Sequence, residues 1–299
     1  MALEAQAPRL AVVTGVSGLG FQTALSLARA GVGIVLAGRN PAKGREAVER
    51  LHADVPGAEV RFETLDLASL GSVSDFVGRL KDGGEPIDIL INNAGIMMPP
   101  ERQTTQEGHE LQFGVNYLGH FALTGGLLPL LSQGARVVSL TSLAQRAAKL
   151  DPADIGMERN YNGGRAYCNS KLLLAMFAVE LHRRAGALVT SVAAHPGFAT
   201  TNIFNGGQTR TTIQSVISTR LIAPFFGHSA AAGAKSIVHA ALSPQVTGGK
   251  LYGPQGLFEM KGPPGESRFA SSVHDTELRA RIWEASQRLT GRPFPDLPV

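Results

Sequence analysis

Cysteine, aromatic residues and charge are scarce in this 299-residue sequence, which has one cysteine, one tryptophan and 17% charged residues. The lone Cys168 excludes an internal disulfide and favours a reducing compartment, so we expect a cytoplasmic location. No apolar run reaches the roughly 18–20 residues that a membrane helix needs, so we expect no membrane anchor. The net charge of +4 is too small and too dispersed to predict nucleic-acid binding, although it suits an anionic small molecule.

Hydrophobic residues are plentiful at 43%, which is enough for a large buried core. Short apolar runs alternate with helical patterns along the chain. This alternation predicts an α/β fold in which a doubly wound parallel sheet of about seven strands carries helices on both faces. The expected strands are 9–14, 33–37, 59–64, 87–91, 136–140, 189–194 and 250–252. No repeat or linker divides the chain, so residues 1–299 are expected to form a single domain.

Three segments outside the strands carry specific predictions. A long helix is expected at about 107–131. The segment 202–227 fits no regular strand–helix unit and is interpreted as a lid over a substrate, with a membrane-surface helix as the alternative. The last helix should be capped by Asp275 or Thr276 and end at Gly291. Its inward residues are expected to be Leu278, Ile282, Trp283 and Leu289.

A glycine-rich turn follows the first strand and reads Gly15-Val16-Ser17-Gly18-Leu19-Gly20. Glycines let a ligand approach the backbone, and the amides at the start of the next helix attract an anion. The turn therefore predicts a phosphate site, although an ordinary tight strand-to-helix turn would look similar.

The end of the second strand predicts which dinucleotide would bind. Arg39 stands there, next to Asn40, and no acidic residue is present. An acid would bind the ribose 2′-hydroxyl of NAD, whereas an arginine accommodates the 2′-phosphate of NADP, so NADP(H) is favoured over NAD(H). A solvated arginine is the alternative. Asp66, after the third strand, could accept from an adenine amino group or cap the following helix.

Tyr167 and Lys171 are four residues apart and should share one face of a helix. A nearby ammonium favours the phenolate, so Lys171 is expected to lower the pKa of Tyr167 towards the range of a general acid or base. A half-buried aromatic beside a solvated charge is the alternative. Cys168 and His195 are interpreted as packing residues.

Taken together, these motifs resemble those of the short-chain dehydrogenase/reductase family over nearly the whole chain. The matching features are the Thr14-Gly15 turn, Asn92-Asn93-Ala94-Gly95, Asn116, Ser142, Tyr167-x-x-x-Lys171 and Pro196-Gly197 with Thr201. The amino-acid sequences of residues 92–100, 195–202 and 251–258 are most similar to those of the retinol-dehydrogenase-like branch, particularly its soluble bacterial members. The resemblance implies a single-domain Rossmann fold and an NADP(H)-dependent alcohol dehydrogenase or carbonyl reductase. Its substrate would be a lipophilic or aromatic secondary alcohol or carbonyl compound.

The resemblance also implies a role for each matching residue. Tyr167 would be the general acid or base, Ser142 would orient the substrate oxygen, Lys171 would bind the nicotinamide ribose, and Asn116 would hold a water for proton relay. The implied cofactor contacts are Gly15, Ser17, Gly18, Leu19 and Gly20 at the pyrophosphate, Arg39 and Asn40 at the adenosine ribose, Asp66 and Leu67 at the adenine, Asn93, Ala94 and Gly95 at the sheet edge, Tyr167 and Lys171 at the ribose, and Pro196, Gly197 and Thr201 at the nicotinamide. No metal site is assigned, and a homodimer or homotetramer is expected from the fold.

One departure from the family pattern concerns the first turn, which usually reads Thr-Gly-x-x-x-Gly-x-Gly. Here only Val16 and Ser17 separate Gly15 from Gly18, so the turn is one residue short. We expect a tightened turn that still binds the cofactor, more weakly. A catalytically silent nucleotide sensor or scaffold of the same fold is the alternative, and an isomerase or lyase that uses bound nicotinamide is a third.

Overall fold

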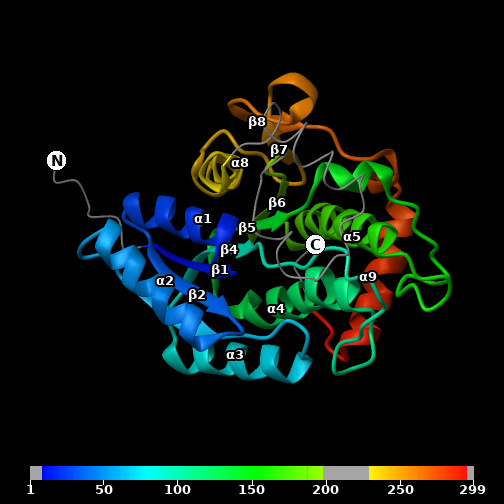
Figure 1. Cartoon of the computed structure of the whole chain (residues 1–299), viewed down its shortest axis with the longest axis horizontal. Helices are drawn as coiled ribbons and strands as arrows, with labels where there is room; N and C mark the ends of the chain where they lie inside the picture. Colours follow the sequence, from blue (N-terminus) through cyan, green and yellow to red (C-terminus); the bar gives the residue numbers. More distant parts are fainter. Residues whose placement is uncertain (1–8, 187, 198–228, 295–299) are drawn as a thin grey trace.

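The fold is built on an eight-stranded sheet with the strand order β3-β2-β1-β4-β5-β6-β7-β8 (Figure 1). The computed structural model describes residues 9–186, 188–197 and 229–294. The strands are β1 Leu10–Thr14, β2 Gly33–Gly38, β3 Val60–Thr64, β4 Ile87–Asn92, β5 Leu131–Leu140, β6 Val189–Ala194, β7 Leu251–Pro254 and β8 Pro264–Ser267. The pairs from β3 to β7 are all parallel, which confirms the predicted doubly wound sheet.

The eighth strand was not expected. β8 pairs antiparallel with β7, with Leu251 opposite Ser267 and Pro254 opposite Pro264. Its sequence, Pro-Gly-Glu-Ser, carries no hydrophobic alternation and starts with a proline, which strands tolerate only at edges and ends. Its pairing with β7 defines it as a strand, and this long-range contact is not visible in the local sequence.

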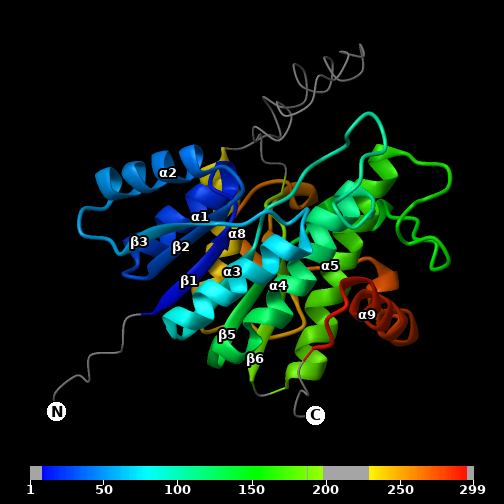
Figure 2. The ribbon, with the colours of Figure 1, turned by 90° about the horizontal axis from the view of Figure 1, so that it is seen from below.

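Helices cover both faces of the sheet, and alternate residues of each central strand point to opposite faces. One face carries α1 Gly18–Arg29, α2 Pro41–Asp54 and α8 Ala230–Leu242. The other carries α3 Leu70–Gly83, α4 Gly119–Leu127 and α5 Gly163–Ala185, which lie side by side in Figure 2. In β1, Val12 packs into the second of these layers, whereas Ala11 and Val13 pack into the first. Strands buried on both faces explain the unbroken apolar runs in the sequence.

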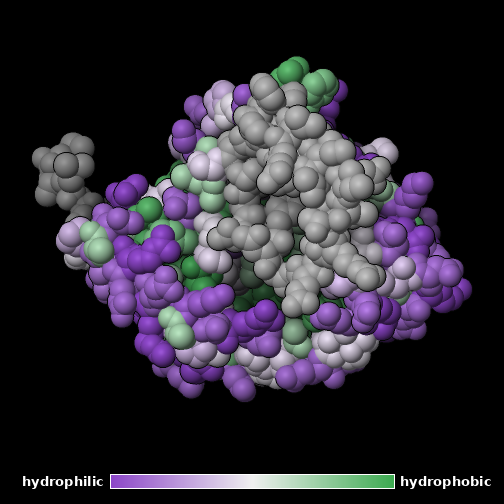
Figure 3. Space-filling view, viewed as in Figure 1, coloured by the Kyte–Doolittle hydropathy of each residue, from purple (hydrophilic) through white to green (hydrophobic). Residues whose placement is uncertain are grey.

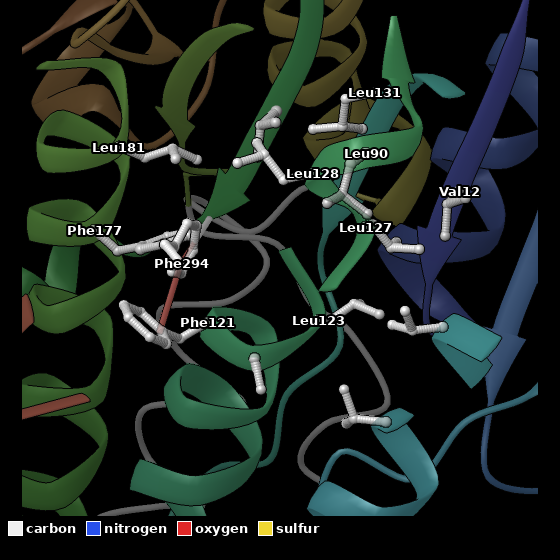
Figure 4. Packing of buried hydrophobic residues seen from close by; sticks show 14 of the residues in the cluster. Val12, Leu90, Phe121, Leu123, Leu127, Leu128, Leu131, Phe177, Leu181 and Phe294 are labelled. Atoms are coloured by element: carbon white, nitrogen blue, oxygen red, sulfur yellow. The ribbon is translucent and has the colours of Figure 1, made fainter. Parts of the chain in front are cut away.

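The α3–α4–α5 layer is filled by aliphatic and aromatic side chains, some of which are drawn in Figure 4. The C-terminal helix α9, Thr276–Thr290, adds Trp283, whose ring centre lies 4.5 Å from that of Phe294 and 5.0 Å from that of Phe121. Aromatic pairs at these separations stabilise a core beyond the area they bury. The last helix is therefore an integral part of the domain.

The predicted inward face of α9 is partly wrong. Asp275 is the N-cap, and Ile282 and Trp283 are buried as expected, but Leu289 is 37% exposed. Ser286 and Thr290 take the inward positions instead, because the Ser286 hydroxyl is hydrogen-bonded to the buried Tyr117 hydroxyl at 2.7 Å.

The long helix expected at 107–131 is interrupted. A π-helical segment, Phe113–Leu118, precedes α4, and a 3-10 turn, Leu128–Leu130, follows it. Glu110 precedes the helix, pairing with Thr104 in an isolated bridge and accepting a hydrogen bond from the Phe113 amide at 2.7 Å. β5 then begins at Leu131. The π-helical segment carries Asn116, and such segments are frequent at functional sites.

The outer surface of the α2 and α3 side is mainly hydrophilic, as Figure 3 shows. Exposed large hydrophobic residues include Leu257 and Phe258, in the turn between β7 and β8, at 66% and 70% exposure. Within the described ranges, no helix is both long enough and apolar enough to cross a bilayer.

Candidate active site

The predicted site residues gather at the carboxyl ends of β1, β2, β4, β5 and β6. In an open α/β sheet this edge is where ligands bind. Thr14, Asn92 and Leu140 end three adjacent strands, and His195 directly follows the end of a fourth.

The glycine turn has the geometry of a phosphate cradle. Gly15 and Gly18 adopt φ values of +97° and +55°, which favour glycine. A Cβ on Gly20 would collide with the Gly15 carbonyl oxygen and lie 2.6 Å from the Asn93 side chain, so only glycine fits there. The Ser17 side chain forms no cap hydrogen bond with the first turn of α1. The shortened turn therefore keeps a tight backbone and an uncapped helix start, which fit a dinucleotide pyrophosphate.

The Thr14 hydroxyl joins the glycine turn to the segment after β4. It accepts hydrogen bonds from the Asn93 and Ala94 amides at 2.8 and 3.0 Å. The Asn93 side chain donates to the Thr14 carbonyl at 2.6 Å. Two segments almost eighty residues apart are thus held as one unit, which positions Asn93, Ala94 and Gly95 at the sheet edge.

At the adenosine end of the predicted site, Arg39 and Asn40 are both exposed, and Asn40 also caps a helix. Arg39 follows β2 and is exposed, as is Asn40. Asn40 caps α2 by accepting from the Lys43 amide at 3.1 Å, so its side-chain oxygen is used locally.

Asp66 does not cap α3, so that alternative is wrong. Ser69 is the N-cap and accepts from the Ser72 amide, while one Asp66 carboxylate oxygen accepts from the Ala68 amide at 2.9 Å. Leu67 is buried, and its carbonyl lies against Gly119.

The catalytic triplet predicted from the sequence is brought together between β5 and α5. Ser142 follows β5 and accepts from the Ala144 amide at 3.2 Å, and its side chain lies close enough to the Tyr167 hydroxyl to lower the pKa of that tyrosine. Tyr167 lies in the first turns of α5, a helix capped by Asn162. Lys171 is buried one turn later, with its Nζ atom 5.8 Å from the Tyr167 ring centre.

The predicted lowering of the Tyr167 pKa by Lys171 is wrong in this structure. Burial raises the pKa of Tyr167, and the nearby Ser142 side chain offsets only part of that increase. Lys171 donates to the Leu140 carbonyl at 2.8 Å, and burial lowers the pKa of its own ammonium to about 8. The spacing of four residues correctly predicted that Tyr167 and Lys171 are close together, but the effect of burial on their pKa values depends on the packed fold.

Asn116 ties the sheet edge to the catalytic helix. Its side chain accepts from the Ile96 amide at 2.8 Å and donates to the Ile96 carbonyl and to the Ser170 hydroxyl, both at 3.0 Å. Ser170 in turn donates to the Tyr167 carbonyl at 2.8 Å. Both side-chain N–H groups of Asn116 are therefore used, so Asn116 can offer a relay water only an acceptor, on its side-chain oxygen or its main-chain carbonyl.

The nicotinamide end of the predicted site begins after β6. Gly197 has φ +71°, and its amide donates to His195 Nδ1 at 3.2 Å. His195 is completely buried, with Nε2 3.1 Å from the Ser267 hydroxyl and 3.3 Å from a Glu259 carboxylate oxygen. These contacts support the packing interpretation of His195. Thr201 and the proposed lid at 202–227 lie outside the described residues.

Comparison with protein-family models identifies the family to which the chain belongs. The family described as short chain dehydrogenase matches residues 9–211. The chain belongs to the short-chain dehydrogenase/reductase family. It is therefore an oxidoreductase that binds a nicotinamide dinucleotide and acts on a small molecule.

Similar proteins support the assignment along almost the whole chain. Human retinol dehydrogenase 13 is 38% identical over 296 residues, covering 96% of this chain and 86% of that protein. Mouse polyprenol dehydrogenase is 37% identical over 303 residues, covering 97% and 86%. A crystal structure of an uncharacterised Mycobacterium paratuberculosis protein has a TM-score of 0.77 and 34% identity, covering 96% of this chain and 95% of that one. The predicted retinol-dehydrogenase-like relationship is confirmed, and these named dehydrogenases do not favour the silent-scaffold alternative.

One buried residue of this short-chain dehydrogenase site was missed in the sequence. His120 is completely buried in α4 and contacts both Thr14 and Asn116. Its spacing of four residues from Asn116 could have placed it on the same helix face. Its contact with Thr14 joins residues 106 apart and needs the fold.

Proposed function

We propose that the protein is an NADP(H)-dependent alcohol dehydrogenase or carbonyl reductase in which Tyr167 is the general acid or base. The observation that carries this proposal is the placement of the Ser142 side chain beside the Tyr167 hydroxyl, with Lys171 one helical turn away at the carboxyl edge of the sheet. Two hydroxyls held together there can both reach one substrate oxygen. Geometry of this kind is what proton transfer to a carbonyl requires.

The chemistry divides between the cofactor and the side chains of the site. When bound, the nicotinamide supplies a hydride to the carbonyl carbon in reduction and accepts it in oxidation. Tyr167 donates its hydroxyl proton to the carbonyl oxygen as the C–O double bond becomes an alcohol, and Ser142 holds that oxygen. In the reverse direction Tyr167 takes the proton back. Because burial raises the pKa of Tyr167, its hydroxyl is protonated at neutral pH, which supports carbonyl reduction.

Arg39 supports a preference for NADP(H) over NAD(H). It is exposed directly after β2, where a 2′-phosphate would lie, and no acidic residue stands beside it at positions 37, 38 and 40. A guanidinium forms paired, charge-assisted hydrogen bonds with phosphate oxygens. An NAD-specific site would place a carboxylate at this strand end.

A lipophilic alcohol or carbonyl compound is the proposed substrate class. Two relatives that match nearly the whole chain are named for retinol and polyprenol, both of which are lipophilic alcohols. Near the site, Met98 is 43% exposed with its amide held by Gln112 at 2.8 Å, which fits an apolar contact. Gln145 is 1% exposed and accepts a hydrogen bond from the Ala270 amide, so it offers no such contact.

The test is Tyr167→Phe, assayed with NADPH and a panel of lipophilic aldehydes and ketones. We expect turnover to fall by about 10²–10⁴-fold, because a positioned proton donor contributes a factor of this size. The affinity for NADPH should change little. Tyr161→Phe is the matched control, since Tyr161 is a half-buried tyrosine whose hydroxyl bonds to the Pro99 carbonyl. Full turnover in Tyr167→Phe would overturn the proposal.

A further inference from the structure

His120 forms a bridge inside the protein between two parts of the site. Its Nδ1 atom lies 2.9 Å from the main-chain carbonyl oxygen of Asn116, and its Nε2 atom lies 3.0 Å from the Thr14 hydroxyl. The imidazole is completely buried. His120 therefore contacts Thr14, which precedes the glycine turn, and Asn116, which is bonded to the catalytic helix, without reaching the surface.

The hydrogen-bond partners define the tautomer of this histidine. A carbonyl oxygen can only accept, so Nδ1 must carry the proton that bonds to Asn116. Nε2 is then an acceptor. The Thr14 hydroxyl can donate its single proton to Nε2 at 3.0 Å or to the Ile91 carbonyl at 3.1 Å. Burial, reinforced by the positive charge of Lys171, lowers the pKa of His120 to about 4, so the ring is neutral at physiological pH.

The bridge closes a ring of contacts through three elements. The Thr14 hydroxyl at the end of β1 accepts from the Asn93 and Ala94 amides. Two residues later, the Ile96 amide donates to the Asn116 side chain. His120 then contacts both the Asn116 carbonyl and the Thr14 hydroxyl, which closes the ring. A second link runs from the His120 carbonyl to Thr124, which donates to it at 2.8 Å, and from there to Asn92 at 3.0 Å. The first link holds α4 to the end of β1, and the second holds it to the end of β4.

The bridge also bears on the irregular backbone around Asn116. A side chain that bonds to the carbonyl four residues earlier competes with the helical ladder. Here that carbonyl belongs to the π-helical segment Phe113–Leu118, where the regular ladder is already shifted. The imidazole therefore holds one lone pair of the Asn116 carbonyl and leaves the other for a further donor.

We propose that His120 is a positioning residue that couples the dinucleotide-binding edge, through Thr14, to the catalytic anchor Asn116. This inference rests on the proposed function. In its neutral form His120 fixes the direction of the Asn116 carbonyl and the position of the Thr14 hydroxyl together. Hydride and proton transfer need their groups aligned to well within 1 Å, so loss of the bridge should lower turnover and not only stability.

Three substitutions separate the two halves of the bridge. His120→Phe keeps a ring and removes both hydrogen bonds. His120→Asn retains a donor close to the position of Nδ1 and should still bond to Asn116, whereas His120→Gln retains an acceptor close to the position of Nε2 and should still bond to Thr14. We expect kcat with saturating NADPH to fall about 10- to 100-fold in His120→Phe and to be largely restored in His120→Asn. His120→Gln should recover NADPH affinity but not kcat.

The control is Tyr117→Phe, which removes a buried hydrogen bond from the preceding turn of the same helical region. Tyr117 bonds to Ser286, and its ring packs against Phe113, Phe121 and Phe177 in the core. We expect it to lower the melting temperature while leaving kcat unchanged. If the His120 variants behave like this control, with reduced stability and normal kcat and NADPH affinity, His120 is a structural residue only and the proposal is overturned.

Two measurements do not depend on turnover. Imidazole ¹⁵N NMR of the wild type should show Nδ1 protonated and Nε2 unprotonated at pH 7, and the reverse tautomer would overturn the proposal. The dissociation constant of NADPH should rise in His120→Phe relative to the wild type and Tyr117→Phe. If the wild type binds NADPH but turns over no carbonyl or alcohol, the proposed function fails. The role of His120 is then decided by the tautomer and by the NADPH dissociation constants of the wild type and His120→Phe.

Discussion

Lys171 and His120 are two buried basic residues of the site, and burial acts on both in the same direction. It lowers the pKa of Lys171 to about 8 and that of His120 to about 4. Both shifts disfavour the charged forms, as expected for groups removed from water. At neutral pH Lys171 is therefore charged and the His120 imidazole is neutral, and the ammonium is placed against the Leu140 carbonyl.

Arg39 carries a prediction about cofactor choice at the same scale. Wild-type protein should bind NADPH more tightly than NADH in a fluorescence titration if, as proposed, the Arg39 guanidinium binds the 2′-phosphate. Arg39→Ala should weaken NADPH binding about 10- to 100-fold, since a hydrogen bond to a charged group contributes about 1.5–3 kcal/mol. NADH binding should be unchanged.

Arg29→Ala is the charge-matched control for this titration. Arg29 is exposed in the last turn of α1, at the opposite end of that helix from the glycine turn. Equal losses of NADPH affinity in both variants would show that net charge, and not contact with the 2′-phosphate, sets the preference. A wild type that prefers NADH would contradict the Arg39 argument directly.

At the scale of elements, the unit formed by β1, the glycine turn and α1 depends on one close backbone contact. Gly20 packs against Gly15 and the Asn93 side chain with no room for a Cβ. The turn is one residue shorter than the family pattern, so its backbone has little slack to absorb a larger residue.

We predict that Gly20→Ala will weaken NADPH binding by more than tenfold, because the added methyl group must push the Gly15 carbonyl out of the turn. Isothermal titration calorimetry would measure the loss. Gly78→Ala in α3 is the control, as a Cβ there meets nothing within 4 Å. That variant should bind NADPH normally and gain about 0.5–1 kcal/mol of stability from helix propensity. Normal NADPH binding by Gly20→Ala would show that the turn is not the pyrophosphate site.

At the scale of the whole molecule, buried histidines link stability to pH. His120 in α4 and His195 after β6 are both completely buried, and burial lowers the pKa of each to about 4. In the unfolded chain both would titrate near 6.5. Between these values the unfolded state binds protons that the folded state excludes, so stability is present above pH 6.5 and is lost as pH falls towards 4.

We therefore predict that the melting temperature falls between pH 6.5 and pH 4. Each histidine contributes up to about 1.4 kcal/mol per pH unit to the free energy of unfolding. His120→Gln should reduce the slope, whereas His52→Gln, at an exposed position of α2, should not. A melting temperature independent of pH over this window would contradict the buried neutral state of both rings.

A cytoplasmic location and a homodimer or homotetramer stay predictions at this scale. So does the arrangement of residues 1–299 as one domain with a lid at 202–227. Gel filtration with light scattering would measure the oligomeric state.

The sequence by itself determined the order of the elements, the edge of the sheet where the site lies and the shared helix face of Tyr167 and Lys171. Each of these rests on local information. Apolar runs set the strands, glycine turns mark where helices begin, and a spacing of four residues puts two side chains on one helix face. Residues at the ends of parallel strands then meet wherever the chain crosses over with the usual handedness.

Only the tertiary structure decided the features that depend on burial or on distant partners. The pKa of Tyr167 rises because packing removes water from it, which no spacing reveals. β8 exists because β7 lies beside it, and the inner face of α9 holds Ser286, bonded to Tyr117, while Leu289 is 37% exposed. His120 joins Thr14 across 106 residues, so its role emerges only when β1 and α4 are packed together.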